Sequence, residues 1–288
     1  MRAGARLASG IFDSNNQAES EMKLALAILA ASAALLLGLP ASAGELTQKD
    51  FEMFAEARFG PPDGKARYWY RHGPVRDLQT GETIYVFEYY DTVRHIIDPK
   101  NPNKRYGIVR KLDLFRDKGT NAVIETMNGQ PVKLWTFPYQ LLELEYKDGK
   151  VMLTVSQGAG EFLRTHKFME SSIERHGNFA HISFPGFYVT RRAELPDHVS
   201  KQSTMSLFMI CEKNCDASTR YQWNQSDVGP LAPWATTESG RLGYRSTSGA
   251  RFESYSELPE QLRAVIDKQY PEFREPAKDL DEVRALQR

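Results

Sequence analysis

The sequence predicts a mainly β fold, a curved antiparallel sheet or meandering β-barrel flanked by short N- and C-terminal helices. Aromatic residues are plentiful, with 15 Phe, 13 Tyr and 4 Trp, and they gather in short alternating segments bounded by Gly, Pro, Asn and Asp. This composition is typical of strands. Turn signals between these segments favour antiparallel neighbours over a parallel α/β sheet.

The clearest local element is a hairpin around Asp148-Gly149. If these two residues form a type I′ turn, three apolar pairs face one side of the hairpin. The pairs are Tyr146 with Val151, Leu144 with Leu153, and Leu142 with Val155. The register is self-consistent, because every second residue of both strands falls on the same face.

A second hairpin is predicted around Asn128-Gly129, with arms over 122–127 and 130–135. Pro131 cannot donate to a ladder, so its arm is expected to be an edge or a bulge. Alternation and flanking turn residues predict further strands over 67–71, 82–90, 106–112, 179–184, 187–192, 204–210, 219–223 and 251–255.

Helices are predicted near the two ends of this strand-rich region. Thr47 can cap a helix over 48–57. Pro259 stands where a first helical position would be, and the following apolar stripe ends before Pro271. A short charged helix or frayed tail is expected over 278–287.

A secretory signal peptide is predicted over 22–43. Lys23 precedes an apolar run over 24–39, and Ala41-Ser42-Ala43 supplies a cleavage site before Gly44. The alternative is a membrane anchor, but this alanine-rich run is shorter than the about 20 residues a span needs. We therefore expect a periplasmic or secreted protein with no membrane association after cleavage.

The chain then divides into three parts. Residues 1–21 are polar and lack periodicity, so they are interpreted as a gene-model extension upstream of Met22. The segment 44–288 is long enough for a single strand-rich domain. Basic and acidic residues balance at 37 each, which gives no electrostatic reason to expect nucleic acid as a partner. The sequence does not indicate the oligomeric state.

Several short motifs resemble, in their order along the chain, those of the DUF1838 family. They are the stretches at 73–82, 136–140, 240–244, 257–259 and 270–273. The resemblance covers most of the mature chain and implies kinship. It implies no active-site residue, because the family has no assigned activity.

The two cysteines, Cys211 and Cys215, are four positions apart in a predicted loop. In an exported protein this spacing favours a disulfide, with two free thiols as the alternative. A zinc site would need further ligands from distant histidines, and the six histidines match no metal motif. No metal and no cofactor is therefore predicted, and no catalytic residue is assigned.

Aromatic residues and arginines cluster beside proline and glycine, where strands reach a barrel rim. These clusters predict a ligand cavity, gated by Arg71 or Arg191, for a small molecule with an apolar or aromatic body and an anionic end. The alternative is that the aromatic rings simply fill the core. The candidate ligand-binding residues are Trp69, Arg71, Trp135, Phe137, Tyr188 and Arg191.

Two hypotheses of function follow. The first is a noncatalytic binder of such a molecule in the cell envelope. The second is an enzyme that acts on it by histidine and carboxylate acid–base chemistry inside the barrel. Two titratable side chains within hydrogen-bond reach on the cavity wall would favour the enzyme, and a purely apolar lining would favour the binder.

Overall fold

The computed structural model of this protein describes residues 46–157, 162–163, 165–167, 171–192, 195–216 and 219–286. The predicted signal peptide and the segment 1–21 lie outside the described residues. Within the described ranges, no helix is long and apolar enough to cross a membrane.

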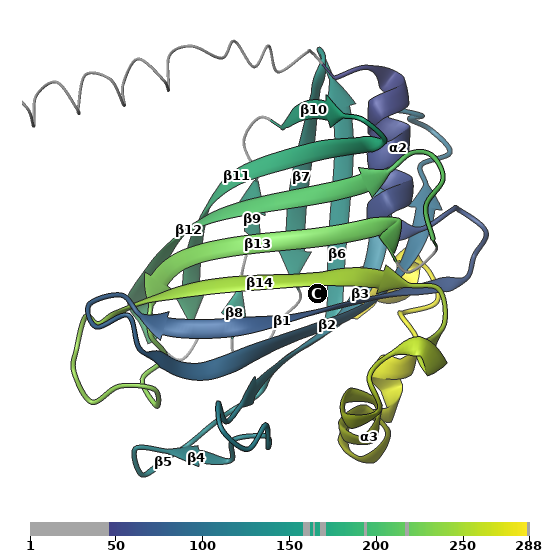
Figure 1. Ribbon diagram of the computed structural model, residues 1–288. Helices are drawn as coiled ribbons and strands as arrows, with labels where there is room; N and C mark the ends of the chain where they lie inside the picture. The colour runs from purple at the N-terminus through teal and green to yellow at the C-terminus, as the bar shows by residue number, and fades with distance from the viewer. Residues whose placement is uncertain are drawn as a thin grey trace, which may run out of the picture. The chain divides into compact units, whose positions relative to one another are not determined.

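One antiparallel sheet dominates the described chain and curls into a nearly closed barrel (Figure 1). This confirms the predicted fold class. Neighbouring strands follow the order β10-β11-β12-β13-β14-β1-β2-β3-β6-β7-β9. The strands are β1 (Ala66–Asp77), β2 (Thr83–Ile97), β3 (Lys104–Arg116), β6 (Trp135–Lys147), β7 (Lys150–Gln157), β9 (Thr165–Lys167), β10 (Ser172–His176), β11 (Phe179–Arg192), β12 (Leu195–Cys211), β13 (Tyr221–Pro230) and β14 (Leu242–Phe252).

The barrel consists of two antiparallel meanders, β1-β2-β3-β6-β7 and β10-β11-β12-β13-β14, which are joined to each other at two places. The pairing of β14 with β1 joins the end of the second meander to the start of the first. On the opposite side, β8 (Phe162–Leu163) pairs with β11, while β9 pairs with β7. The two ends of the sheet therefore come together around one short segment, and this brings the barrel close to closure.

The hairpin between β6 and β7 has the predicted register. Tyr146 lies opposite Val151, Leu144 opposite Leu153 and Leu142 opposite Val155. At the turn, Asp148 and Gly149 have φ angles of 52° and 74°, as a type I′ turn requires. The prediction is confirmed because this turn chemistry alone fixes which residues pair.

Several predicted strand bounds were wrong. The strand expected over 251–255 is β14, which spans Leu242–Phe252. The hairpin around Asn128-Gly129 consists only of β4 (Thr126–Met127) and β5 (Gln130–Pro131), which form a separate two-stranded sheet. The two strands expected on either side of Pro185-Gly186 are one strand, β11. Strand β11 pairs with β10 only as far as Ser183. In the described pairing, Pro185 therefore lies just past the point where this edge of β11 loses its partner strand.

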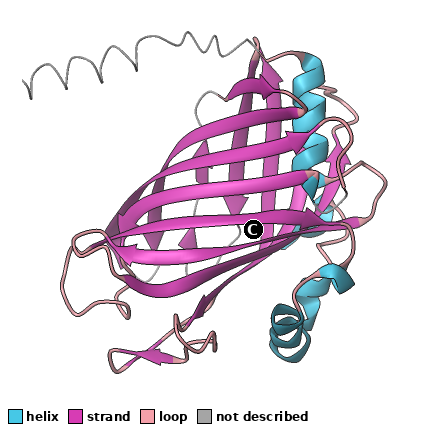
Figure 2. Cartoon of the chain, in the orientation of Figure 1, coloured by secondary structure: helices cyan, strands magenta, loops and turns pink. Residues whose placement is uncertain are grey.

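Helix α2 (Gln48–Phe59) lies across one end of the strands (Figure 2). Thr47 and Asp50 form a capping box: the Thr47 hydroxyl accepts from the Asp50 N–H at 3.2 Å, and the Thr47 N–H donates to the Asp50 carboxylate at 2.8 Å. The predicted cap is therefore confirmed. Phe51, Phe54 and Phe59 of this helix are fully buried.

The C-terminal elements cover the outer face of the first strands. They are η2 (Tyr255–Glu257), α3 (Glu260–Gln269), η3 (Pro271–Arg274) and α4 (Leu280–Leu286). Pro259 is the residue before α3, one position earlier than predicted, with an extended ψ of 134°. Leu262 and Ile266 of α3 belong to one cluster with Leu112 and Leu114 of β3. Strand β3 is therefore buried on both of its faces.

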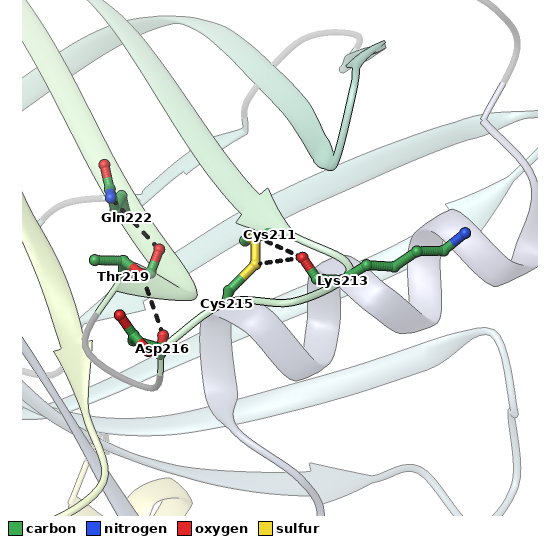
Figure 3. The surroundings of a disulfide bond; sticks show 6 residues. All are labelled: Cys211, Lys213, Cys215, Asp216, Thr219 and Gln222. Atoms are coloured by element: carbon green, nitrogen blue, oxygen red, sulfur yellow. Dashed lines mark hydrogen bonds between the residues drawn. A yellow bond between two sulfur atoms is a disulfide. The ribbon is translucent and has the colours of Figure 1, made fainter.

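The structure joins Cys211 and Cys215 by a disulfide (Figure 3). The bridge closes the loop after β12, and the carbonyl oxygen of Lys213 lies 3.4 Å and 3.0 Å from the two sulfur atoms. Further along the same connection, the Thr219 hydroxyl donates to the carbonyl oxygen of Asp216 at 3.2 Å. The loop that links β12 to β13 is thus tied at two points.

Candidate ligand-binding site

A cavity lies inside the barrel, among side chains from α2 and from nine strands of the wall. The space open to the centre of a water molecule amounts to about 80 Å³. One water needs roughly 10–15 Å³ by this measure, so several waters or one small organic molecule would fit. Its apolar lining includes Phe184, Phe208, Leu142, Leu153 and Val155.

The register of the sheet places six of the lining residues in one row across the barrel. Each member of this row lies directly opposite the next on the adjacent strand. In order the row runs through Phe208, Trp223, Gly249, Arg71, Tyr89, Asp113 and Trp135. All except Gly249 line the cavity, so the strand pairing itself assembles the site.

Arg71 is held between two aromatic rings at the centre of this row. Its guanidinium carbon lies 4.2 Å from the centre of the Tyr89 ring and 4.1 Å from that of Trp223. Trp223 is two strands away, and the intervening position is Gly249. A Cβ atom at Gly249 would overlap the Tyr70 carbonyl oxygen and the Arg71 backbone. The glycine therefore allows β1 and β14 to approach closely enough for this arrangement.

The Arg71 side chain is buried and only partly satisfied by hydrogen bonds. It is 2% exposed, its Nη1 donates to the Thr247 hydroxyl, and its Nε has no partner. Burial, together with the nearby Arg245 cation, lowers the pKa of Arg71 to about 10. The guanidinium stays charged at neutral pH, but in a position where a charge is costly.

The other cations around the cavity each have a carboxylate partner. Burial opposes the charge of Asp227, yet its pairing with Arg245 holds the pKa of that carboxyl below its ordinary value. Among the described side chains around the cavity, Arg71 is the cation without such a partner. The pairs are Arg58 with Asp91 at 2.6 Å, Lys111 with Asp113 at 3.0 Å, and Arg245 with Asp227 at 2.7 Å.

Several buried polar atoms of the lining have no hydrogen-bond partner. Besides Arg71 Nε, they are Asp113 Oδ1, Ser206 Oγ, Trp223 Nε1 and Arg58 Nη1. Buried polar groups in folded proteins are nearly always paired with protein atoms or with water. Unpaired donors and an acceptor around one cavity indicate a place where a bound molecule or ordered water completes the hydrogen bonding.

Two of the predicted ligand-binding residues, Arg71 and Trp135, line the cavity. Arg71 does so as part of the interior wall, so the prediction that it gates an opening needs correction. Its exposure of 2% leaves it no contact with solvent from which to act as a gate. The side chains of Tyr188 and Arg191 lie outside the described residues.

Trp69 and Phe137 are placed elsewhere in the core, which corrects their predicted role. Trp69 is fully buried, and its Nε1 donates to the carbonyl oxygen of Arg58 at 2.8 Å. Its ring packs edge-on against Trp223 and does not reach the cavity. Phe137 lies opposite Lys111 in the ladder, with the Lys111 ammonium 4.6 Å from its ring centre. Neither ring lines the cavity.

Sequence reasoning missed the charged residues of the wall, above all Lys111 and Asp113. These residues alternate with Leu112 and Leu114 in the segment 111–114. A simple alternation rule would turn the leucines toward the barrel interior and the charges toward solvent. The structure has the opposite arrangement, because the C-terminal helices cover the leucines from outside. The alternation of charges and leucines is visible in the sequence, but it does not say which of the two faces lies inside the barrel.

Comparison with protein-family models, with curated proteins and with solved structures finds no match to this chain. Kinship with the DUF1838 family therefore stays a prediction. Among the described residues, no group of three or more His, Cys, Asp or Glu side chains is placed to hold a metal ion.

Proposed function

We propose that the barrel is a noncatalytic binder of a small anionic molecule with an apolar or aromatic body. The observation that carries the proposal is Arg71, a buried guanidinium without a carboxylate partner at the wall of a cavity. A buried cation is stabilised by a bound anion, and a guanidinium can pair with a carboxylate through two parallel hydrogen bonds. Described charges around the cavity comprise four cations against three carboxylates, which also favours an anion.

The apolar part of the ligand is supported by the remaining lining. Phe184 and Phe208 on one side, and Leu142 and Val155 on another, offer surfaces that exclude water without hydrogen bonding. Ligand cavities combine such surfaces with a few convergent polar groups. The cavity is small, so a single-ring acid suits it better than a long-chain lipid.

The setting that we propose for this function is the periplasm or the extracellular space. The signal peptide predicted over 22–43 favours export, and the Cys211–Cys215 disulfide is compatible with an oxidising compartment. N-terminal sequencing of the protein from its host should begin at Gly44. Recovery of the chain with the segment 24–39 still attached would contradict export with cleavage.

The binding proposal is tested by Arg71→Met, which keeps an unbranched side chain between the two rings and removes the charge. Arg76→Met is the matched control, because Arg76 is exposed on the same strand. Benzoate and phenylacetate are suitable probes, and quenching of Trp135 and Trp223 fluorescence reports their binding. We expect Arg71→Met to weaken binding by about tenfold or more, as loss of a charged hydrogen bond does. Equal affinity in both variants would overturn the proposal.

A second candidate, an enzyme with acid–base chemistry, is supported by one observation. Lys111 and Asp113 lie within 3.0 Å of each other on the cavity wall, and Asp113 Oδ1 has no partner. A carboxylate so placed could take a proton from a bound molecule. The described lining contains no histidine, however, so the predicted histidine and carboxylate pair is not assembled there. Conversion of a bound acid by the intact protein, abolished in Asp113→Asn with binding retained, would establish this candidate.

A further inference from the structure

The second polar group that a ligand would meet in the cavity is Asp113. Its side chain is 1% exposed, and one oxygen, Oδ2, lies 3.0 Å from the Lys111 ammonium. The other oxygen, Oδ1, is buried without a partner. A carboxylate oxygen has only lone pairs to offer, so this atom can be satisfied only by a hydrogen-bond donor.

Asp113 and Arg71 lie on opposite sides of Tyr89 in the same row of the sheet. Arg71 is opposite Tyr89 on one neighbouring strand, and Asp113 is opposite Tyr89 on the other. Two strand spacings separate their backbones by about 10 Å, and both side chains reach inward from there. A molecule lying beside Tyr89, between Arg71 and Asp113, would therefore face a donor at one end and an acceptor at the other.

The charges near Asp113 decide which kind of donor suits it. Lys111 already neutralises the carboxylate, and its ammonium lies 5.0 Å from the Tyr89 ring centre, on which Arg71 also stacks. A cationic amine on the ligand would be repelled by these groups. A hydroxyl would donate to Asp113 Oδ1 without adding charge.

We infer that the ligand is a hydroxylated aromatic acid, whose carboxylate pairs with Arg71 and whose hydroxyl donates to Asp113 Oδ1. This inference rests on the proposed binding function and adds the class of ligand. It also assigns Asp113 as a residue that sets specificity, because an acid without the hydroxyl leaves a buried acceptor unpaired.

The test compares three probes that differ at one position of the ring: benzoate, 4-hydroxybenzoate and 4-methoxybenzoate. The phenylacetate series, with the same three substituents, covers a slightly longer separation between the two ends. On the unaltered protein we expect the hydroxylated acid of at least one series to bind about tenfold or more tightly than its parent. The methoxy acid should bind less tightly than the parent, because its ether oxygen would face Oδ1.

The variant Asp113→Asn then assigns the contact to this residue. It keeps the size of the side chain and an oxygen for Lys111, so benzoate should still bind through Arg71. The preference for the hydroxylated acid over the methoxy acid should shrink to within about twofold, since the NH₂ group of an amide at Oδ1 can donate to the oxygen of either substituent. A preference that persists in this variant would show that the hydroxyl is recognised elsewhere. If the variant does not fold, the probe series on the unaltered protein still decides the ligand class.

The outcomes separate the two proposals. If none of the acids binds, or if Arg71→Met binds them unchanged, the proposed function fails. If the parent acids bind through Arg71 but the hydroxyl brings no gain in either series, only the inference about ligand class fails.

Discussion

Two neighbouring regions of the barrel interior are filled in opposite ways. Beside α2, Phe54 is fully buried and packs against Phe184 and Phe208, with ring centres 4.6 Å and 5.1 Å away; these two rings form the boundary with the cavity. Around Arg71, the wall of the cavity carries charges and hydrogen-bonding groups that have no partner. Burial of large rings stabilises the fold, whereas buried charges contribute little or oppose it. The difference separates the part of the interior that holds the barrel together from the part available for recognition.

The largest effect should come from the packed region. Phe54 is 0% exposed, so Phe54→Ala should lower the free energy of unfolding by about 3–5 kcal/mol. Glu52→Ala, an exposed substitution on the same helix, is the control and should change it by less than about 0.5 kcal/mol. Chemical denaturation measures both. A loss below about 1 kcal/mol in Phe54→Ala would mean that α2 is not an integral part of the core.

The second-largest effect is a loss of stability at acidic pH, and it also arises near α2. His95 is buried, donates from Nδ1 to the Gly60 carbonyl oxygen at 2.6 Å, and packs against Phe59. Burial, and the nearby Arg105 and Arg251, lower the pKa of His95 to about 4 from 6.5. Between these two pH values His95 is protonated in the unfolded chain and neutral in the folded protein. The free energy of unfolding should therefore fall as the pH falls.

The expected loss between pH 6.5 and 4 is on the order of 3 kcal/mol. His95→Gln can still donate to the Gly60 carbonyl, and it should remove this part of the pH dependence. Unfolding free energies measured at several pH values across this window check the prediction. The same slope in the variant and in the unaltered protein would assign the acid sensitivity to other groups.

The smallest effect on stability should come from the cavity. Arg71→Met removes a buried charge that has no carboxylate partner, and the gain from this offsets the lost stacking on Tyr89 and Trp223. We expect a change in unfolding free energy within about 1 kcal/mol, in either direction, alongside the loss of anion binding. A loss comparable to that of Phe54→Ala would make Arg71 a structural residue and erase the contrast between the two regions.

The parts of the fold that could be predicted from the sequence are those fixed by local chemistry. Asp148-Gly149 determines the β6–β7 register, and Thr47 determines the start of α2, because each acts through its immediate neighbours. The break expected at Pro185-Gly186 did not occur. What a proline does to a strand depends on whether another strand lies beside it, and this is decided by residues far away in the sequence.

The candidate site shows the same limit more strongly. Arg71 and Trp135 could be singled out because they lie in conspicuous aromatic clusters, but the same clusters also drew attention to Trp69 and Phe137, which do not line the cavity. Lys111 and Asp113 could not be assigned to the interior without knowing that α3 covers the other face of their strand. Where both faces of a strand are buried, the tertiary structure decides which face lies inside the barrel.

The position of Arg71 between Tyr89 and Trp223 has a consequence for the cost of recognition. An arginine side chain that must be ordered when a ligand arrives loses up to about 2 kcal/mol of rotamer freedom at that moment. Here the close approach of backbones at Gly249 fixes the guanidinium already in the molecule without a ligand. The entropy is lost when the chain folds, so ordering of this side chain does not oppose the binding of a ligand.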